Sequence, residues 1–321
     1  MTLPPVHLTR FRAMGCAVEV RLSPADERLD AAEVLRGLSA LVEDWEEELS
    51  RFRSTSGLMQ LNARAGAWTP VSETLFEVIS CARHAGWLTG GLYNPLILPA
   101  LIAQGYDRDF AQIAQAGAAA STSAAINTPS WETIELRTTH REVRIPEGAA
   151  LDLGGIAKGW AADRIANTLA PYGACLVNLG GDIAVHGAPN DQPGWAVHIG
   201  DPLHDQPFAT VYLRSGSIVT SGADYRRWRV QDGTWRHHII DPRTGGSANS
   251  DVLSVTVIHA DGALAEAYAK AALLLGSNAG LRWLDNQWAT PGLVIRTDGA
   301  VVATEAMQIR LSQPPAPAPT F

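Results

Sequence analysis

The chain has 321 residues, of which 46% are hydrophobic and 18% charged, with a formal net charge of −8 at pH 7. Such a composition is typical of a globular protein with enough apolar residues for one large core or two lobes. The sequence has no basic block to bind nucleic acid and no run near the roughly 18 apolar residues of a membrane span, so we expect neither nucleic-acid binding nor membrane insertion.

The first sixteen residues contain a possible export signal that the surrounding sequence argues against. "AMGC" resembles a lipoprotein cleavage site ending at Cys16, but His7, Arg10 and Arg12 interrupt the apolar run that a signal peptide requires. We therefore predict a cytoplasmic protein. The three cysteines are far apart and form no C-x-x-C pair, so neither a disulfide framework nor a zinc site is indicated.

The first half of the chain predicts one strand, two helices and a surface excursion. Residues 16–22 alternate as a half-buried strand does, and residues 29–52 carry apolar side chains at helical spacing, which predicts one long amphipathic helix. Residues 72–88 predict a second helix, ended by Gly90 and Gly91. The Ala- and Ser-biased segment 111–130 is interpreted as a surface excursion.

The second half predicts mostly short strands. A strand is expected at 142–145, a turn and helix over 152–164, and a strand with a turn within 174–187. Short strands at hairpin spacing are expected at 195–200, 208–214 and 217–220, and another strand at 252–258, before a helix between Asp261 and Gly276 and two more strands. Hairpins with separate helices indicate an α+β fold. We expect one catalytic domain over residues 1–310, followed by a disordered Pro-rich tail at 311–321.

The segment "DLGGIAKGWAADR" (152–164) raises the possibility of a phosphate-binding loop, because a glycine pair before a helix can approach an anion closely. It is not a P-loop, since Lys158 precedes Gly159, and its glycines miss the dinucleotide-binding spacing. Taken alone, the segment also fits a tight strand-to-helix turn.

Three further segments carry polar groups in patterns that fit a site but also fit ordinary turns and strands. "NLGGDI" places Asp182 after a glycine pair, and "VTSGADYRRWRV" places Ser221 before three arginines. In "RHHIIDPRTGG", His238 and Asp241 stand at the mouth of a turn, where a histidine beside an aspartate is a candidate general base.

Together and in this order, these segments resemble the ApbE family of FAD:protein FMN transferases. The resemblance runs from about Met14 to Leu275. It is carried by "MG", "ELSRFRSTSGLMQLN", "GGLYNP", "LDLGGIAKGWAADR", "VNLGGDI", "VTSGADYRRW", "HHIIDPRTG" and "SVTVIHADGALAEAYAKAALLLG". The run H-I-I-D-P-R-T-G is specific to the family. The resemblance implies a two-lobed fold with antiparallel or mixed sheets and flanking helices, and FAD between the lobes.

The resemblance also implies roles for individual residues. Positions expected to bind FAD are Met14, Phe52, Leu92, Tyr93, Asn94, Asp152, Lys158, Asp182, Ser221, Arg227 and Ile240. His238 matches the family's base, and Asp241 or its turn is expected to orient it. Cys16 and Asn94 depart from the family pattern, which usually has Thr and Asp at these two positions.

The same resemblance implies a Mg²⁺ site, which this sequence alters. The backbone carbonyl of Gly155 falls at a ligand position, and the family usually has Asp and Thr where Glu266 and Lys270 stand. Glu266 retains an oxygen donor, whereas an ammonium group has no lone pair for a metal. We therefore expect Lys270 to replace part of the metal's charge, with an outward-turned Lys270 and a retained Mg²⁺ as the alternative.

The resulting expectation is FMN transfer from FAD to a Thr or Ser hydroxyl of an acceptor flavoprotein, with release of AMP. FAD is then a substrate rather than a redox cofactor. Two alternatives remain open: a non-catalytic FAD-binding protein, and a pyrophosphatase that splits FAD into FMN and AMP.

Overall fold

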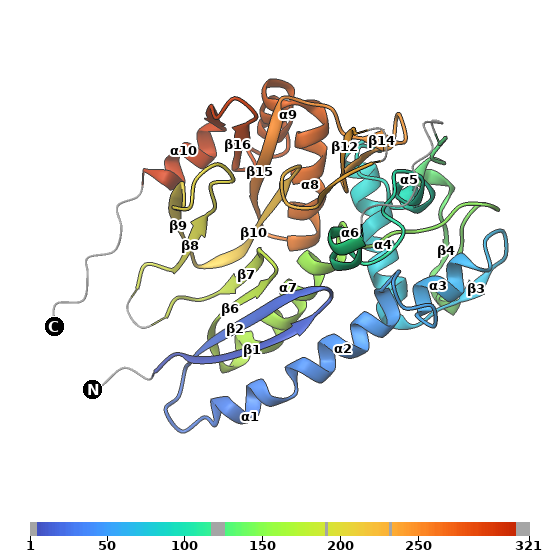
Figure 1. The fold of residues 1–321 in the computed structure, drawn as a ribbon. Helices are drawn as coiled ribbons and strands as arrows, with labels where there is room; N and C mark the ends of the chain where they lie inside the picture. The colour runs from blue at the N-terminus through green and yellow to red at the C-terminus, as the bar shows by residue number, and fades with distance from the viewer. Residues whose placement is uncertain (1–4, 117–125, 190–191, 231–232, 313–321) are drawn as a thin grey trace.

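The protein is built around one large antiparallel sheet (Figure 1). The computed structural model describes residues 5–116, 126–189, 192–230 and 233–312. Every strand pair within these residues is antiparallel. In their order across the sheet, the strands are β1 (His7–Ala13), β2 (Cys16–Pro24), β6 (Gly173–Leu179), β7 (Asp182–His186), β10 (Ser215–Gly222), β15 (Val252–His259), β16 (Gly292–Arg296) and β17 (Val301–Ala303).

Helices cover one face of this sheet. Alternate residues such as Val177, Val219 and Val257 point into two cores shared with the helices. The helices of the chain are α1 (Ala31–Arg36), α2 (Leu38–Leu49), α3 (Gly57–Asn62), α4 (Glu73–Leu88), α5 (Leu98–Ala103), α6 (Phe110–Ala116), α7 (Ala157–Leu169), α8 (Gly262–Leu275), α9 (Ser277–Asn286) and α10 (Glu305–Leu311). Of these, α7 and α8 lie against the central strands.

The opposite face of the sheet is covered by a hairpin and by α10. Strands β8 (Trp195–Ile199) and β9 (Ala209–Leu213) pair with each other, and Trp195 and Val211 pack with Met307 and with the intervening sheet residues Leu176 and Ile218. Because both faces are buried, the central strands have apolar residues at successive positions.

A second region, formed by α3 to α6 and a small sheet, lies beside the main sheet (Figure 1). The small sheet has β3 (Thr69–Pro70), β5 (Glu142–Arg144) and β4 (Glu135–Arg137) in that order. Two short hairpins complete the fold: β11 (Arg227–Arg229) with β12 (Trp235–His237), and β13 (Ile240–Asp241) with β14 (Gly246–Ser247). Trp228 and Ile240 pack with Leu101 of α5, which attaches both hairpins to this region.

The antiparallel sheet with separate helices confirms the α+β prediction. The prediction of one helix over 29–52 was wrong, since the segment forms α1 and α2, which meet at Gly37, a residue of low helix propensity. Helix α9 was not predicted, because "SNAGLRWLDN" is largely polar. The expected surface excursion 111–130 is wrong at its start, because Ile113 is buried in α6; residues 117–125 lie outside the described residues.

The tail prediction concerns 311–321, of which only the end of α10 and Ser312 are described. Among the described residues, we find no helix with both the length and the apolar character needed to span a bilayer. The single domain over 1–310 stays a prediction.

Candidate active site

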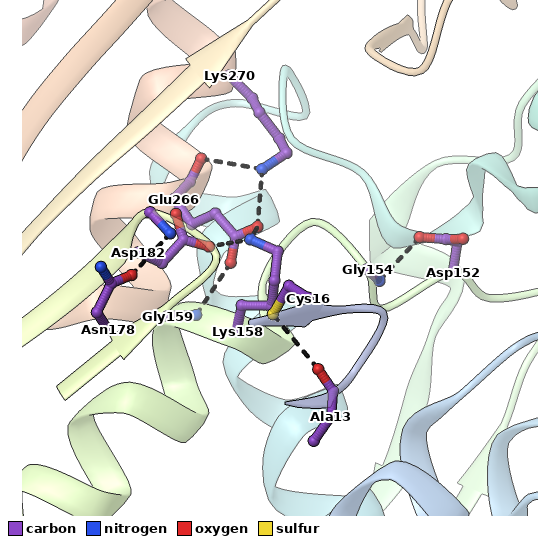
Figure 2. Close-up of polar contacts among 11 residues, drawn as sticks. Ala13, Cys16, Asp152, Gly154, Lys158, Gly159, Asn178, Asp182, Glu266 and Lys270 are labelled. Atoms are coloured by element: carbon purple, nitrogen blue, oxygen red, sulfur yellow. Dashed lines mark hydrogen bonds and ion pairs between the residues drawn. The ribbon is translucent and has the colours of Figure 1, made fainter. Parts of the chain in front are cut away.

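Side chains from four segments that are far apart in sequence meet beside the main sheet (Figure 2). One is the tip of the β1–β2 hairpin, where Met14 and Gly15 form a two-residue turn with φ of 51° and 69°. Both positive φ values are those of a type I′ turn, which favours glycine at its second position. The Met14 N–H donates to Glu46 Oε2 at 2.6 Å, which fixes the tip against α2.

The start of α7 crosses α8 at two glycines. A Cβ atom on Gly159 would overlap the carbonyl oxygen of Gly262, and one on Gly262 would lie 2.7 Å from the oxygen of Gly159. Any side chain at this crossing would push the helices apart. The glycines therefore allow the close approach that brings Lys158 of α7 next to Glu266 of α8.

Four charged side chains form a cluster at this crossing, which we call the Glu266 cluster: Lys158, Asp182, Glu266 and Lys270 (Figure 2). Lys158 forms an ion pair with Asp182, and its Nζ also lies 3.4 Å from Glu266 Oε1. Lys270 Nζ lies 3.1 Å from the same Oε1, while Glu266 Oε2 accepts the Gly159 N–H at 3.2 Å. The structure thus brings together the predicted residues Lys158, Asp182, Glu266 and Lys270.

Both oxygens of Glu266 have donors, Oε1 from two ammonium groups and Oε2 from a backbone N–H. Burial alone would raise the pKa of this carboxyl, but the ammonium groups of Lys158 and Lys270, with the Gly159 N–H, hold it below its usual value. Burial lowers the pKa of Lys158, which the charge of Glu266 opposes. Among the described residues, no three His, Cys, Asp or Glu side chains are grouped to hold a metal. Of the expected metal ligands, Lys270 has no lone pair to offer, and both oxygens of Glu266 already accept from protein donors.

Gly155 lies against this cluster for a steric reason. A Cβ at this position would stand 3.0 Å from Lys270 Cε and 3.4 Å from the ring of Tyr93. The predicted metal-ligand positions Gly155 and Lys270 are thus adjacent, and the lysine chain fills the space beside the glycine.

The two neighbouring histidines differ in how their rings are bonded. The ring of His237 lies 2.9 Å from the Ala248 carbonyl through Nε2 and accepts the Ile239 N–H at Nδ1, so both of its nitrogens have partners. The Nδ1 atom of His238 is buried, and no group in the described part of the chain bonds to it. Burial lowers the pKa of His238 well below its usual value, and the charges of Arg226 and Lys270 lower it further. The imidazole of His238 is thus favoured in its neutral form, and its buried Nδ1 has no hydrogen-bond partner among the described residues.

The Asp241 carboxylate bonds Arg243 rather than His238, so of the two predicted ways of orienting the imidazole, the direct bond from Asp241 is not made. Its carboxylate accepts hydrogen bonds from the Arg243 guanidinium, at 2.9 Å from Nε and 2.7 Å from Nη2. It also accepts the Arg243 N–H, while its carbonyl accepts the Gly245 N–H. Asp241 therefore closes the D-P-R-T-G turn, and its role is local.

The arginine nearest His238 is Arg226 rather than the predicted Arg227. Arg227 is exposed and stacks on Trp235, with its guanidinium carbon 4.9 Å from the ring centre. Arg226 is half-buried, and its carbonyl accepts the His238 N–H at 3.2 Å. Arg226 lies just before β11, and its charge lowers the pKa of His238, whereas Arg227 lies on the strand and stacks on Trp235.

Asp152 is held by an arginine that the sequence did not single out. Arg51 Nε lies 2.8 Å from Asp152 Oδ2, and Asp152 Oδ1 accepts the Gly154 N–H at 2.9 Å. The Arg51 guanidinium also stacks on Phe52 and Tyr106, at 4.2 and 4.3 Å from the ring centres. The predicted FAD-binding residues Phe52 and Asp152 thus share one buried guanidinium.

The segment Leu92–Tyr93–Asn94 is fixed within the protein. Leu92 is half-buried against the core of α8 and α9, and Tyr93 is buried with an unpartnered hydroxyl. The Asn94 side chain donates to the Pro129 carbonyl at 2.8 Å and accepts the Leu96 N–H at 3.0 Å. Both the nitrogen and the oxygen of the Asn94 amide therefore bond to backbone groups of the protein.

Two further predicted residues lie on strands near these groups. Ser221 is buried on β10 opposite Val255, and Ile240 is buried on β13 opposite Ser247. Among the functional candidates that sequence reasoning missed, Arg51 was indicated only by its place before Phe52. Arg226 was one of three adjacent arginines, which the pattern alone could not separate.

A cavity of about 460 Å³ lies elsewhere, between α2, α3 and β3. Its lining includes Glu48, Arg53 and Arg64 and none of the residues discussed above. The chemistry of the charged groups, rather than cavity size, therefore marks the candidate active site.

Comparisons with known proteins agree with this geometry. The model of the ApbE family matches residues 14–293. A Treponema pallidum FAD:protein FMN transferase is 32% identical over 282 residues, covering 82% of this chain and 77% of the relative. A Klebsiella pneumoniae protein of the same name is 28% identical and covers 93% of this chain and 92% of the relative.

The fold agrees as well. The crystal structure of the ApbE protein from Thermotoga maritima superposes with a TM-score of 0.84 at 25% identity, over 96% of this chain and 100% of the other. The family model covers most of the chain, and the predicted ApbE-like fold is confirmed. This chain belongs to the ApbE family.

Proposed function

We propose that this protein is an FAD:protein FMN transferase that moves FMN from FAD to a Thr or Ser hydroxyl of an acceptor flavoprotein. The hydroxyl oxygen attacks the FMN phosphorus, the bond from that phosphorus to the AMP oxygen breaks, and AMP leaves. The hydroxyl proton passes to His238. The observation that carries this proposal is the neutral, unpartnered His238 nitrogen beside the positive charges of Arg226 and Lys270.

Positive groups would stabilise the charge that develops on the pyrophosphate. Lys158 and Lys270 lie in the Glu266 cluster, and the half-buried Arg226 makes no ion pair with a described carboxylate. Arginine suits phosphate oxygens because its guanidinium presents several donors in a plane. We assign pyrophosphate binding to Arg226 and Lys158, and FAD binding more widely to the segments around Phe52, Tyr93 and Asp152.

We further propose that transfer does not require Mg²⁺ at Glu266. Two ammonium groups lie within 3.4 Å of Glu266 Oε1 and a backbone N–H occupies Oε2, so a divalent cation would have to displace them. Lys270 then supplies one positive charge where Mg²⁺ would supply two, and slower transfer is expected.

The proposed cytoplasmic location has a structural argument beside the sequence one. Cleavage before Cys16 would remove β1, whose seven residues all pair with β2. Lipidation at Cys16 after such cleavage would therefore leave the sheet without β1.

The proposal is tested by incubating the protein with FAD, with and without an acceptor domain, and measuring AMP and the flavin that stays on the denatured acceptor. Transfer predicts AMP together with covalent flavin, and only when the acceptor is present. AMP without acceptor would indicate a pyrophosphatase, and tight FAD binding without AMP would indicate a binding protein. Either outcome contradicts the proposal.

A further inference from the structure

Tyr93 carries a hydroxyl group that is enclosed by the protein and makes no hydrogen bond to it. Only 5% of the residue is exposed, and among the described residues no group bonds to the hydroxyl oxygen. A buried tyrosine usually bonds its hydroxyl, because an enclosed donor without an acceptor destabilises the folded state. An exception beside a functional site points to an acceptor that the free protein does not supply.

The hydroxyl end of the Tyr93 ring borders Gly155 and the side chain of Lys270. A Cβ atom on Gly155 would lie 3.4 Å from Tyr93 Cε2, which is bonded to the carbon that carries the hydroxyl, and 3.0 Å from Lys270 Cε. Burial raises the pKa of Tyr93 well above its usual value, and the charges of Glu266 and Asp152 raise it further. The phenol therefore keeps its proton and lies close to the Glu266 cluster.

The two carboxylates that act on Tyr93 accept from other groups. The oxygens of Glu266 have two ammonium groups and a backbone N–H as donors. Those of Asp152 have the Arg51 guanidinium and another backbone N–H. The Tyr93 hydroxyl is thus left as a donor, and an oxygen brought by a ligand would satisfy it.

The ligand group that fits this position is a phosphate. Lys158 and Lys270 bring two ammonium groups to the site, and the half-buried Arg226 makes no ion pair with a described carboxylate. A phosphate oxygen is attracted by these charges and is a strong acceptor for a hydroxyl donor. FAD has such oxygens only in its pyrophosphate, because its flavin and adenine rings are uncharged.

The side chain of Lys270 separates the hydroxyl from an entering ligand. Its Cδ and Cε atoms fill the space beside Gly155, and the side chain is 15% exposed. A lysine has a flexible stem, so a phosphate can move these atoms aside while the ammonium group stays near enough to pair with it. The hydroxyl then comes within reach of a phosphate oxygen.

From these observations we propose that the Tyr93 hydroxyl donates a hydrogen bond to a pyrophosphate oxygen of bound FAD, beside the Lys270 ammonium. This inference rests on the proposed transferase function and adds a positioning contact to it. Because the hydroxyl has no acceptor in the free protein, its removal should weaken ligand binding without destabilising the fold.

The test compares the wild type with Tyr93→Phe, which removes only the hydroxyl, and with the matched control Tyr268→Phe. Tyr268 is also buried, but its ring packs against His259 and Trp283 rather than at the Glu266 cluster. Calorimetry on the full chain measures the affinities for FAD, for ADP, which has a pyrophosphate but no flavin, and for riboflavin, which has a flavin but no phosphate. Urea unfolding without ligand measures stability.

We expect Tyr93→Phe to bind FAD and ADP roughly tenfold more weakly than the wild type does, and riboflavin equally well. The free energy of unfolding of this variant, measured without ligand, should equal or exceed that of the wild type. Tyr268→Phe should bind each ligand as the wild type does.

An unchanged affinity of Tyr93→Phe for FAD would overturn the proposal. Equally weakened riboflavin binding would do so as well, because it would place the hydroxyl at the flavin ring. A loss of stability without ligand would also overturn it, since the hydroxyl would then already have an acceptor in the free protein.

Failure of the transferase proposal can be told apart from failure of this one. AMP release is measured separately on the wild-type protein with FAD and an acceptor domain. Weaker FAD and ADP binding by Tyr93→Phe, together with no AMP from the wild type, would contradict the transferase function and leave the Tyr93 contact standing.

Discussion

Lys270 follows Glu266 by one turn of α8, and its Nζ lies 3.1 Å from Glu266 Oε1 on a side chain that is 15% exposed. Such a pair on a helix surface would contribute only about 0.3–0.5 kcal/mol. Here the glutamate is buried and also contacts Lys158, so loss of either lysine changes the charge of the site. We therefore expect the two residues to set the charge of the candidate active site, beyond the small stabilisation that an exposed pair would give.

Replacing Lys270 should therefore change the response to metal. In Lys270→Thr, Glu266 loses one ammonium partner and the helix gains a hydroxyl oxygen at the same position, which makes oxygen ligation possible. We expect slower FMN transfer in EDTA than for the wild type, and partial recovery on addition of Mg²⁺. An unchanged metal response in this variant would count against the role given to Lys270.

Replacing His238 should abolish transfer, whereas replacing His237 should not. His238→Ala should bind FAD but lose transfer by ~10²-fold or more, the usual scale for a general base. His237→Ala should retain transfer, because its ring is bonded to backbone groups. Since the pKa of His238 is lowered, the wild-type rate should hold until the pH falls well below the usual histidine value. Transfer rates of both variants are measured at saturating FAD. If His237→Ala is the inactive variant, the assignment of His238 as the base is wrong.

The crossing of α7 and α8 should not tolerate a methyl group. Gly159→Ala would place a Cβ on the Gly262 carbonyl, so we expect destabilisation of about 1–3 kcal/mol and weaker FAD binding. Gly37→Ala is the matched control, because a Cβ there has no neighbour within 4 Å and the backbone is helical. Urea unfolding of the two variants checks this, and similar losses in both would contradict the steric account.

Asp163 should make stability depend on pH. Burial raises the pKa of Asp163 to about 6, although hydrogen bonds from Ser217 Oγ and the Gly262 N–H act to lower it. The folded state then binds more protons than the unfolded state between about pH 4 and 6, so this contribution is complete below that range and is lost as the pH rises through about 6.

Asp163→Asn removes this titration. Relative to that variant, the unfolding free energy of the wild type should fall by roughly 3 kcal/mol between pH 4 and pH 7. Denaturant titrations of both proteins across this range measure the difference. Parallel pH profiles would show that Asp163 does not titrate as described.

Much of the fold could be predicted from sequence where one local signal dominated. Alternation predicted β2, a strand and a turn were predicted where β6 leads into β7, and Asp261 and Gly276 marked the ends of α8. Helix α9 was missed because its polar sequence is buried only along one edge, through Gly280 and Leu284. Helices α1 and α2 were merged because apolar spacing continues across Gly37.

The site was predicted by resemblance more than by local pattern. Sequence reasoning took the glycines near Lys158 as room for an anion, whereas the space beside Gly155 holds Lys270 and that beside Gly159 holds α8. Asp182 and Glu266 reach Lys158 from segments 24 and 108 residues away, which no local pattern contains. The choice between Arg226 and Arg227 depended on where β11 begins, because Arg227 lies on the strand and stacks on Trp235 while Arg226 precedes it.

The most direct test is the rate of FMN transfer by the wild-type protein in EDTA, followed by graded additions of Mg²⁺, with AMP and denaturation-resistant flavin as the two readouts. Because Glu266 already has two ammonium partners, the account predicts that slow transfer persists in EDTA and rises little with Mg²⁺. Complete loss of transfer in EDTA, restored by Mg²⁺, would contradict it.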